Sequence, residues 1–267
     1  LENESCPTCG SCAGMFTANS MNCMTEVIGM GLEGNGTIPA VYSERKLLAK
    51  KAGMKVMHLV KKNIKPSDIM TKESFQNALV VDMALGCSTN TVLHLMAIAE
   101  EAQVKLDLDI FNDFSNKVPN LCKLSPAGPY HMQDLHHAGG LSGIMNELTR
   151  KDLLNLNVIT VDGVILEERL KNKKVLNHEV IRSIEKPYSQ TGGLKILFGN
   201  IAPEGAVVKK SAVLEKMLYT KGPAKVFDSE EASVEAILSG QIKPGDVIVI
   251  RYEGPKGSGM PEMFYTS

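Results

Sequence analysis

The sequence predicts an α/β protein with a helix-rich N-terminal α/β domain and a mainly β domain after it. Apolar residues recur at helical spacing through the first part, and short apolar runs bounded by turn residues follow. The chain has 267 residues, of which 43% are hydrophobic and 22% charged. At ~150 residues per domain, this length favours about two domains with sizeable cores.

The first part is predicted to contain four substantial helices. The first two cover residues 15–27 and 40–62, and we expect both to pack against the rest of the domain. A third covers 73–85, and Ser88 offers a cap to a fourth, in which Val92, Leu95, Met96 and Ala99 form a buried stripe. Shorter helical patterns lie between residues 106 and 154 and at 166–170.

Beyond residue 172 the pattern changes to strands, at 194–198, 206–209, 224–227 and 246–252. One helix interrupts them, capped by Asp228 or Ser229 and closed by Gly240. We therefore expect the domains to cover residues 1–172 and 173–267, both as partial domains.

Charge and composition exclude several classes of protein. Lys and Arg number 29 and Asp and Glu 30, a net charge of −1, which provides no basic surface for nucleic acid or anionic membranes. The most apolar stretch, 78–99, contains Asp82, Asn90 and His94, so no membrane span is predicted. The six cysteines are too few for a disulfide scaffold and indicate a reducing, cytoplasmic location. The start lacks both Met and a signal peptide, as expected of a fragment's edge.

The segment Cys6-Pro7-Thr8-Cys9-Gly10-Ser11-Cys12 is the most informative one. Three thiols at a spacing of three, with Pro and Gly between them, can direct more than one sulfur to a common point. A helix that begins just after Cys12 would stabilise the thiolate that a metal requires. The alternative is that these cysteines are small buried hydrophobes. No fourth cysteine follows at zinc-finger spacing.

Three other segments carry possible chemistry. Gly29-Met30-Gly31-Leu32-Glu33-Gly34 matches a dinucleotide motif, but it follows a helix rather than a strand, so we interpret it as a helix stop. His131, Asp134, His136 and His137 could bind a metal, although their spacing fits a polar helix start better. In the loop after the last strand, Glu253 and Glu262 are carboxylates that Mg²⁺ could use; taken alone, they fit solvated side chains better.

Together, several motifs resemble the dihydroxy-acid dehydratase family of branched-chain amino-acid synthesis, from end to end of the chain. They are the cysteine segment continued to Cys23, Gly86-Cys-Ser-Thr-Asn-Thr-Val-Leu-His-Leu95, Tyr130-His-Met-Gln-Asp134, Gly199-Asn200, Lys221-Gly-Pro-Ala-Lys225 and Val249-Ile-Arg-Tyr-Glu-Gly-Pro-Lys-Gly257. Gly86-Cys87 departs from the Gly-Gly usual in the family.

The resemblance implies a hydro-lyase that converts 2,3-dihydroxy-3-methylbutanoate and its homologue into 2-oxo acids. It also implies that the mainly β part is a barrel-like swivelling domain. It implies a 2Fe–2S or 4Fe–4S cluster with Cys12 as a ligand, so that Cys6 and Cys9 need not bind iron. It also implies Mg²⁺ bound by Glu262, in Met260-Pro261-Glu262-Met263, and a cytoplasmic homodimer acting on a small molecule. The family's base and remaining ligands fall outside residues 1–267, so this chain alone is expected to be inactive.

Two alternatives remain open on the sequence. One is a sugar-acid dehydratase, acting on an aldonate or 6-phosphogluconate with the same site and a more polar pocket. The other is a non-catalytic metal or electron-transfer module that uses Cys6, Cys9 and Cys12 together and does not need Glu262.

Overall fold

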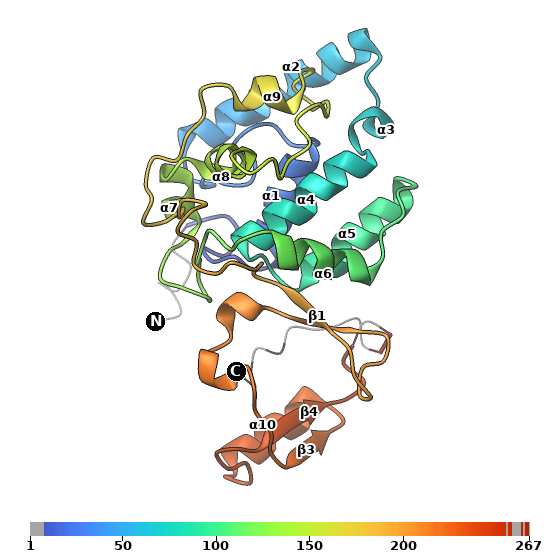
Figure 1. The fold of residues 1–267 in the computed structure, drawn as a ribbon, viewed down its shortest axis with the longest axis vertical. Helices are drawn as coiled ribbons and strands as arrows, with labels where there is room; N and C mark the ends of the chain where they lie inside the picture. The colour runs from blue at the N-terminus through green and yellow to red at the C-terminus, as the bar shows by residue number, and fades with distance from the viewer. Residues whose placement is uncertain (1–7, 255, 258–262, 264, 267) are drawn as a thin grey trace. The chain divides into compact units, whose positions relative to one another are not determined.

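The computed structural model describes residues 8–254, 256–257, 263 and 265–266. The chain divides into two compact units, Leu1–Val213 and Leu214–Ser267 (Figure 1). Helices and strands occur together, as an α/β class requires. None of the helices in the described ranges is both long and apolar enough to cross a membrane.

The first unit is helix-rich, as its apolar periodicity predicts. Its elements are α1 (Thr17–Ile28), α2 (Ser43–Lys62), α3 (Pro66–Ile69), α4 (Lys72–Leu85), α5 (Asn90–Glu101), α6 (Leu108–Lys117), α7 (Met132–His137), α8 (Gly140–Thr149), α9 (Leu166–Leu170), β1 (Lys195–Leu197) and β2 (Ala206–Val208), followed by the 3-10 turn Lys210–Ala212.

Helix α4 forms the centre of this unit. Every residue from Ser74 to Leu85 except Gln76 is buried. A helix that is apolar on all sides is stable only when other elements surround it. Helices α1, α5, α6 and α8 all pack against α4 and supply that cover.

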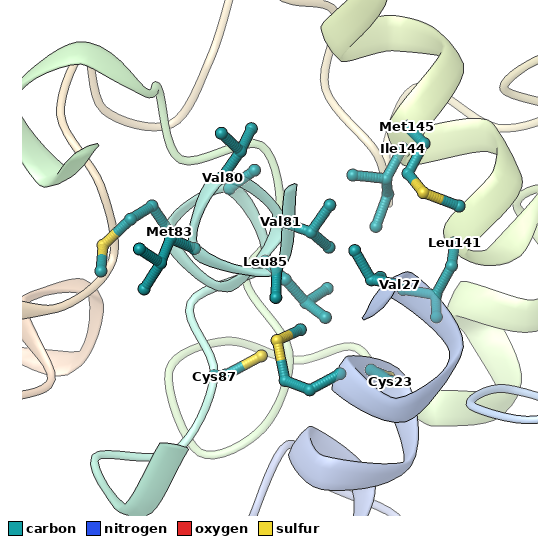
Figure 2. Packing of buried hydrophobic residues seen from close by; sticks show 14 of the residues in the cluster. Cys23, Val27, Val80, Val81, Met83, Leu85, Cys87, Leu141, Ile144 and Met145 are labelled. Atoms are coloured by element: carbon teal, nitrogen blue, oxygen red, sulfur yellow. The ribbon is translucent and has the colours of Figure 1, made fainter. Parts of the chain in front are cut away.

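The core between α1, α4 and α8 is built from aliphatic and sulfur-containing side chains. Figure 2 shows Val27 of α1 and Leu141 of α8 close to Val81 and Leu85 of α4. All four side chains are buried. This packing fixes α1, and with it the segment that precedes α1.

The expectation that residues 40–62 pack against the domain is wrong. No residue of α2 is buried. Its large apolar side chains Leu47, Met54, Val56, Met57 and Val60 are between 51% and 68% exposed. The apolar spacing predicted the helix correctly but did not reveal whether the rest of this chain covers it.

Strands β1 and β2 form an antiparallel pair in which Ile196 lies opposite Val207. Helix α6 holds this pair through Asn112, whose side chain accepts a hydrogen bond from the Ile196 amide and donates one to its carbonyl, both at 3.0 Å. Ser115 Oγ donates to the Leu194 carbonyl oxygen at 2.6 Å. Polar side chains on the inner face of α6 therefore satisfy the edge of β1.

The second unit contains the 3-10 turn Glu215–Met217, β3 (Ala224–Phe227), α10 (Glu230–Leu238) and β4 (Val247–Ile250). Strands β3 and β4 are parallel, with Val226 opposite Val249, and α10 is the crossover between them. Ser229 caps α10 by accepting from the Ala232 amide at 3.2 Å, as one of the two predicted caps. Within the described ranges the sheets have two strands each and form no closed barrel.

Residues 173–213 belong to the same compact unit as the preceding helices. They include β1 and β2, the first two of the strands predicted beyond residue 172. The proposed domain junction near residue 172 stays a prediction, distinct from the division at Val213.

Candidate functional site

The described part of the cysteine segment is an exposed loop that leads into α1. Cys9 and Cys12 are both exposed and free of disulfide bonds. Their exposure excludes the alternative in which these two thiols are buried hydrophobes. Cys6 lies outside the described residues.

Asn19, in the first turns of α1, holds the loop on both sides of Cys12. Its side-chain amide donates to the carbonyl oxygen of Cys12 and, at 2.7 Å, to that of Gly14. Its Oδ1 accepts from Ser11 Oγ at 2.6 Å. Because Asn19 is only 6% exposed, these partners satisfy an amide that would otherwise be buried without hydrogen bonds.

Two backbone hydrogen bonds complete the attachment of the loop. The Met132 amide, at the start of α7, donates to the Ala13 carbonyl at 2.8 Å. The Met15 amide donates to the Ser125 carbonyl at 2.7 Å. These bonds fix the residues after Cys12, and the Asn19 bond to Ser11 holds the residue before it, while the Cys12 thiol remains exposed.

The Cys12 loop forms one wall of a cavity of about 760 Å³. The opposite walls come from the loop between α1 and α2 and from the start of α7. Its polar lining residues include Cys9, Cys12, Asn19, Asn22, Thr37, Arg45, His131, Gln133 and Asp134. A space of this size and polarity suits a small polar ligand or cofactor.

Charges of both signs lie on the cavity wall. Arg45 donates to the carbonyl oxygens of Asn35, at 3.0 Å, and Ile38, which fixes its guanidinium beside the loop. Asp134 accepts from the His131 amide at 2.8 Å. Nearby, the ring of His136 lies 6.0 Å from that of Tyr42, the residue that precedes α2. The site therefore offers a cation, a carboxylate and a thiol to a bound molecule.

The helix does not begin directly after Cys12. Residues 13–16 intervene, and α1 starts at Thr17 with Phe16 as its N-cap. Thr17 Oγ1 contacts Ser88 Oγ at 3.2 Å and accepts from Asn90 Nδ2 at 2.6 Å, so the start of α1 is joined to α5. Thr89 occupies the position before α5 but makes no side-chain capping bond, whereas Ser88 Oγ accepts from the Asn90 amide at 3.2 Å, so Ser88 supplies the predicted cap.

The remaining cysteines belong to the core. Cys23, Cys87 and Cys122 are buried, and burial raises the pKa of each thiol. A neutral buried thiol is a poor metal ligand, since metals bind the thiolate. Only Cys9 and Cys12 among the described cysteines are available to a metal.

Glu262 lies outside the described residues, so its predicted role as a Mg²⁺ ligand stays a prediction. Glu253 is half-buried, and its Oε1 accepts from the Glu230 amide at 3.4 Å. Across the part of the chain that the structure describes, no three His, Cys, Asp or Glu side chains are grouped to hold a metal.

The histidine segment forms a polar helix start, as its spacing favoured. Asp134 and His131 begin α7 through the amide contact described above. His136 Nε2 pairs with Glu44 at 3.3 Å, and Tyr42 Oη lies 3.2 Å from His137 Nε2. Burial lowers the pKa of His136, and Glu44 partly opposes this shift. These contacts connect α7 with the beginning of α2.

The glycine motif at 29–34 is a helix stop, as interpreted. Gly29 ends α1 in the left-handed region, with φ 98°, and its amide donates to the Glu26 carbonyl at 3.1 Å. No helix begins at Gly34, so nothing here presents helix amides to a pyrophosphate.

Two residues important to the site were not singled out from the sequence. Asn19 is one of the polar residues on the buried face of α1, and that position on an apolar stripe was the available signal. Lys209 donates to the carbonyls of Met15 at 3.3 Å, Gly86 at 2.8 Å and Cys87 at 3.2 Å. Its partners are distant in sequence, so no local pattern indicated them.

Comparison with known proteins identifies the family of this chain. Residues 1–169 match the model of the dihydroxy-acid/6-phosphogluconate dehydratase N-terminal domain, and residues 179–267 match that of the C-terminal domain. The chain is 64% identical over 264 residues to a dihydroxy-acid dehydratase of Ruminiclostridium cellulolyticum. Identity is 64% and 65% over 263 residues to those of Acetivibrio thermocellus and Carboxydothermus hydrogenoformans.

Each of these alignments covers 98% of this chain and 48% of the relative. The chain therefore spans about half the length of the curated relatives that it matches. Both family models align in order, and together they cover nearly all of its residues. The chain belongs to the dihydroxy-acid/6-phosphogluconate dehydratase family.

Proposed function

We propose that this chain is part of an iron–sulfur dehydratase that converts 2,3-dihydroxy-3-methylbutanoate and its homologue into 2-oxo acids, in valine and isoleucine biosynthesis. The observation that carries the proposal is the exposed Cys12 thiol on the wall of a polar cavity. Support also comes from the relatives, which are named dihydroxy-acid dehydratases.

The cavity offers an iron–sulfur cluster one suitable ligand, the Cys12 thiol. Cys12 provides an accessible sulfur on a fixed backbone, which is the donor that iron–sulfur clusters use. The described residues hold no group of three metal-ligating side chains, so Cys12 would be one ligand of a site with further donors. When bound, a cluster with an open iron position supplies Lewis acidity toward a substrate hydroxyl.

The chain's own residues would bind and orient the substrate. Dehydration requires removal of the C2 proton and loss of the C3 hydroxyl, and the resulting enol becomes the 2-oxo acid. Arg45 brings a positive charge to the cavity, which favours a carboxylate substrate. His131, Gln133 and Asp134 offer hydrogen-bonding groups for substrate hydroxyls.

Further features of the proposal rest on the family resemblance. Glu262 would hold Mg²⁺, which binds carboxylate and hydroxyl oxygens. Residues 173–267 would contribute to a swivelling barrel-like domain. The complete enzyme would be a cytoplasmic homodimer.

The proposal can be tested in a chimaera in which this chain replaces the aligned part of the Acetivibrio thermocellus relative. The chimaera should dehydrate 2,3-dihydroxy-3-methylbutanoate. Cys12→Ser should reduce turnover by at least 1,000-fold, while the matched change Cys9→Ser should leave it within about threefold, since only one of the two thiols is a ligand. Glu262→Gln should retain iron and lose activity.

Two results would contradict the proposal. Turnover of 6-phosphogluconate or another aldonate, with none of the branched dihydroxy acid, would assign a sugar-acid dehydratase. Equal loss of iron from Cys6→Ser, Cys9→Ser and Cys12→Ser, with no effect of Glu262→Gln, would favour a non-catalytic metal or electron-transfer module.

A further inference from the structure

All of the observed hydrogen bonds of the Asn19 side chain are made with the loop that carries Cys12. Its two donated bonds reach the carbonyls of Cys12 and Gly14, and its oxygen accepts from Ser11. The residues that it holds lie before, at and after the position of the thiol. No other side chain in the described ranges donates to the Cys12 carbonyl.

The helix that carries Asn19 is itself fixed. Cys23, Met24 and Val27 of α1 are buried against the core, and α1 packs on α4. A buried amide on a fixed helix determines the path of the backbone that it binds, because any shift of that backbone would leave the amide without a partner. Residues 11–14 form no helix or strand, so the loop has no backbone hydrogen-bonding pattern of its own that would fix its path.

We propose that Asn19 is the positioning residue of the cluster site: it fixes the backbone at Cys12 so that the thiol is presented to the cavity in one orientation before any metal binds. This inference rests on the proposed role of Cys12. It adds that the orientation is built into the metal-free chain.

The first test is amide hydrogen exchange in the metal-free chain. Two amides report on the loop, those of Met15, bound to Ser125, and Met132, bound to Ala13. Asn19→Asp preserves shape but replaces two donors with a carboxylate facing two carbonyls. Exchange at both amides should rise about tenfold, while amides in the middle of α4 keep the parent's rate.

Two further variants complete the hydrogen-exchange test. Ser11 is exposed, and Ser11→Ala removes the bond that Asn19 Oδ1 accepts, so exchange at the same amides should rise about threefold. Asn116→Asp is the matched control, because it makes the same chemical change on α6 and keeps its acceptor for Lys195. Unchanged exchange at Met15 and Met132 in both Asn19→Asp and Ser11→Ala would overturn the inference. So would an equal rise throughout α4, which would indicate a general loss of stability.

The second test measures iron and sulfide bound per chain in the chimaera after anaerobic reconstitution. Asn19→Asp should reduce bound iron at least fivefold, and Asn116→Asp should not. Full iron in Asn19→Asp, with iron lost in Cys12→Ser, would overturn the inference and leave the proposed function intact. Full iron in Cys12→Ser would instead refute the proposed function, while the exchange results would still decide whether Asn19 fixes the loop.

Discussion

Single polar residues in buried positions determine much of the behaviour of this chain. Asp82 lies in the fully buried part of α4, where Thr91 Oγ1 donates to its Oδ2 at 3.0 Å and its Oδ1 has no hydrogen-bond partner. Burial raises the pKa of this carboxyl to about 7, although Thr91, the Cys87 thiol and the charge of Lys209 oppose the shift. Such a group costs stability whenever it is ionised.

The Asp82 carboxyl should make unfolding pH-dependent. Its pKa is higher in the folded chain than its ordinary value of 3.8, so the folded state holds the proton more tightly. The contribution of Asp82 to stability is therefore greatest below about pH 4, falls as the pH rises to about 7, and is level above that. The folded state should lose about 4 kcal/mol across this range through Asp82, at about 1.4 kcal/mol per pKa unit.

Urea unfolding of Asp82→Asn between pH 4 and pH 8 measures this contribution. The difference in unfolding free energy between variant and parent should shift in favour of the variant as the pH rises. Asp109→Asn, which changes an exposed aspartate in the first turn of α6, is the control and should follow the parent. A constant difference between Asp82→Asn and the parent would show that Asp82 does not titrate in this range.

Lys209 should stabilise the first unit through the three carbonyls that it binds. Its burial lowers the pKa of the ammonium, while the nearby Cys87 and Asp82 raise it. Lys209→Met should lower the free energy of unfolding by about 2–4 kcal/mol, since three acceptors lose a charged donor. The exposed substitution Lys105→Met should change it by less than about 0.5 kcal/mol. Equal unfolding midpoints in urea for both variants would contradict this account.

At the scale of secondary structure, the sequence predicted where most helices and strands lie. It was less successful at predicting where they begin and whether they are buried. The four strands and the helix α10 lie where short apolar runs and capping residues indicated. Helix α1 begins two residues later than predicted, because Asn19 satisfies carbonyls of the preceding loop and that loop remains outside the helix. The exposure of α2 depends on long-range contacts, which periodicity does not contain.

Two glycines with opposite roles test the interpretation of residues 29–34 as a helix stop. Gly29→Ala would place a Cβ 3.0 Å from Ile69 Cγ2 at a positive φ, and should destabilise the chain by about 1–3 kcal/mol. Gly53→Ala, in the middle of α2 with open space around it, should stabilise α2 by about 0.5–1 kcal/mol. Thermal unfolding followed by circular dichroism measures both, and a neutral Gly29→Ala would contradict the helix-stop interpretation.

At the scale of the whole chain, the sequence indicated the candidate ligand Cys12 but not the residues from other elements that surround and hold it. The cysteine spacing and the resemblance both singled out Cys12, and the structure places that thiol on a cavity. Asn19, Arg45 and Met132 come to this cavity from separate elements, and no spacing rule links them. Cys6 and Glu262 lie outside the described residues, so their roles remain predictions.

The division into two units predicts where a protease first cuts. Residues 214–223, ahead of β3, are exposed throughout and contain Lys216 and Lys221. Limited trypsin digestion should cut there first and release a stable fragment that ends near residue 216 or 221. Mass spectrometry of early products identifies the site. A first cut among Lys171, Lys173 and Lys174 would instead support independent domains that meet near residue 172.

The central claim is that Cys12, and neither Cys9 nor a group of cysteines, is the ligand that this chain gives to a cluster. Differential alkylation of the iron-loaded chimaera, read by mass spectrometry, tests it most directly because both thiols are exposed in the metal-free chain. Iodoacetamide should label Cys9 whether or not iron is present, and Cys12 only after iron is removed. Labelling of Cys12 at the same rate in both states, or equal protection of Cys9, would contradict the account.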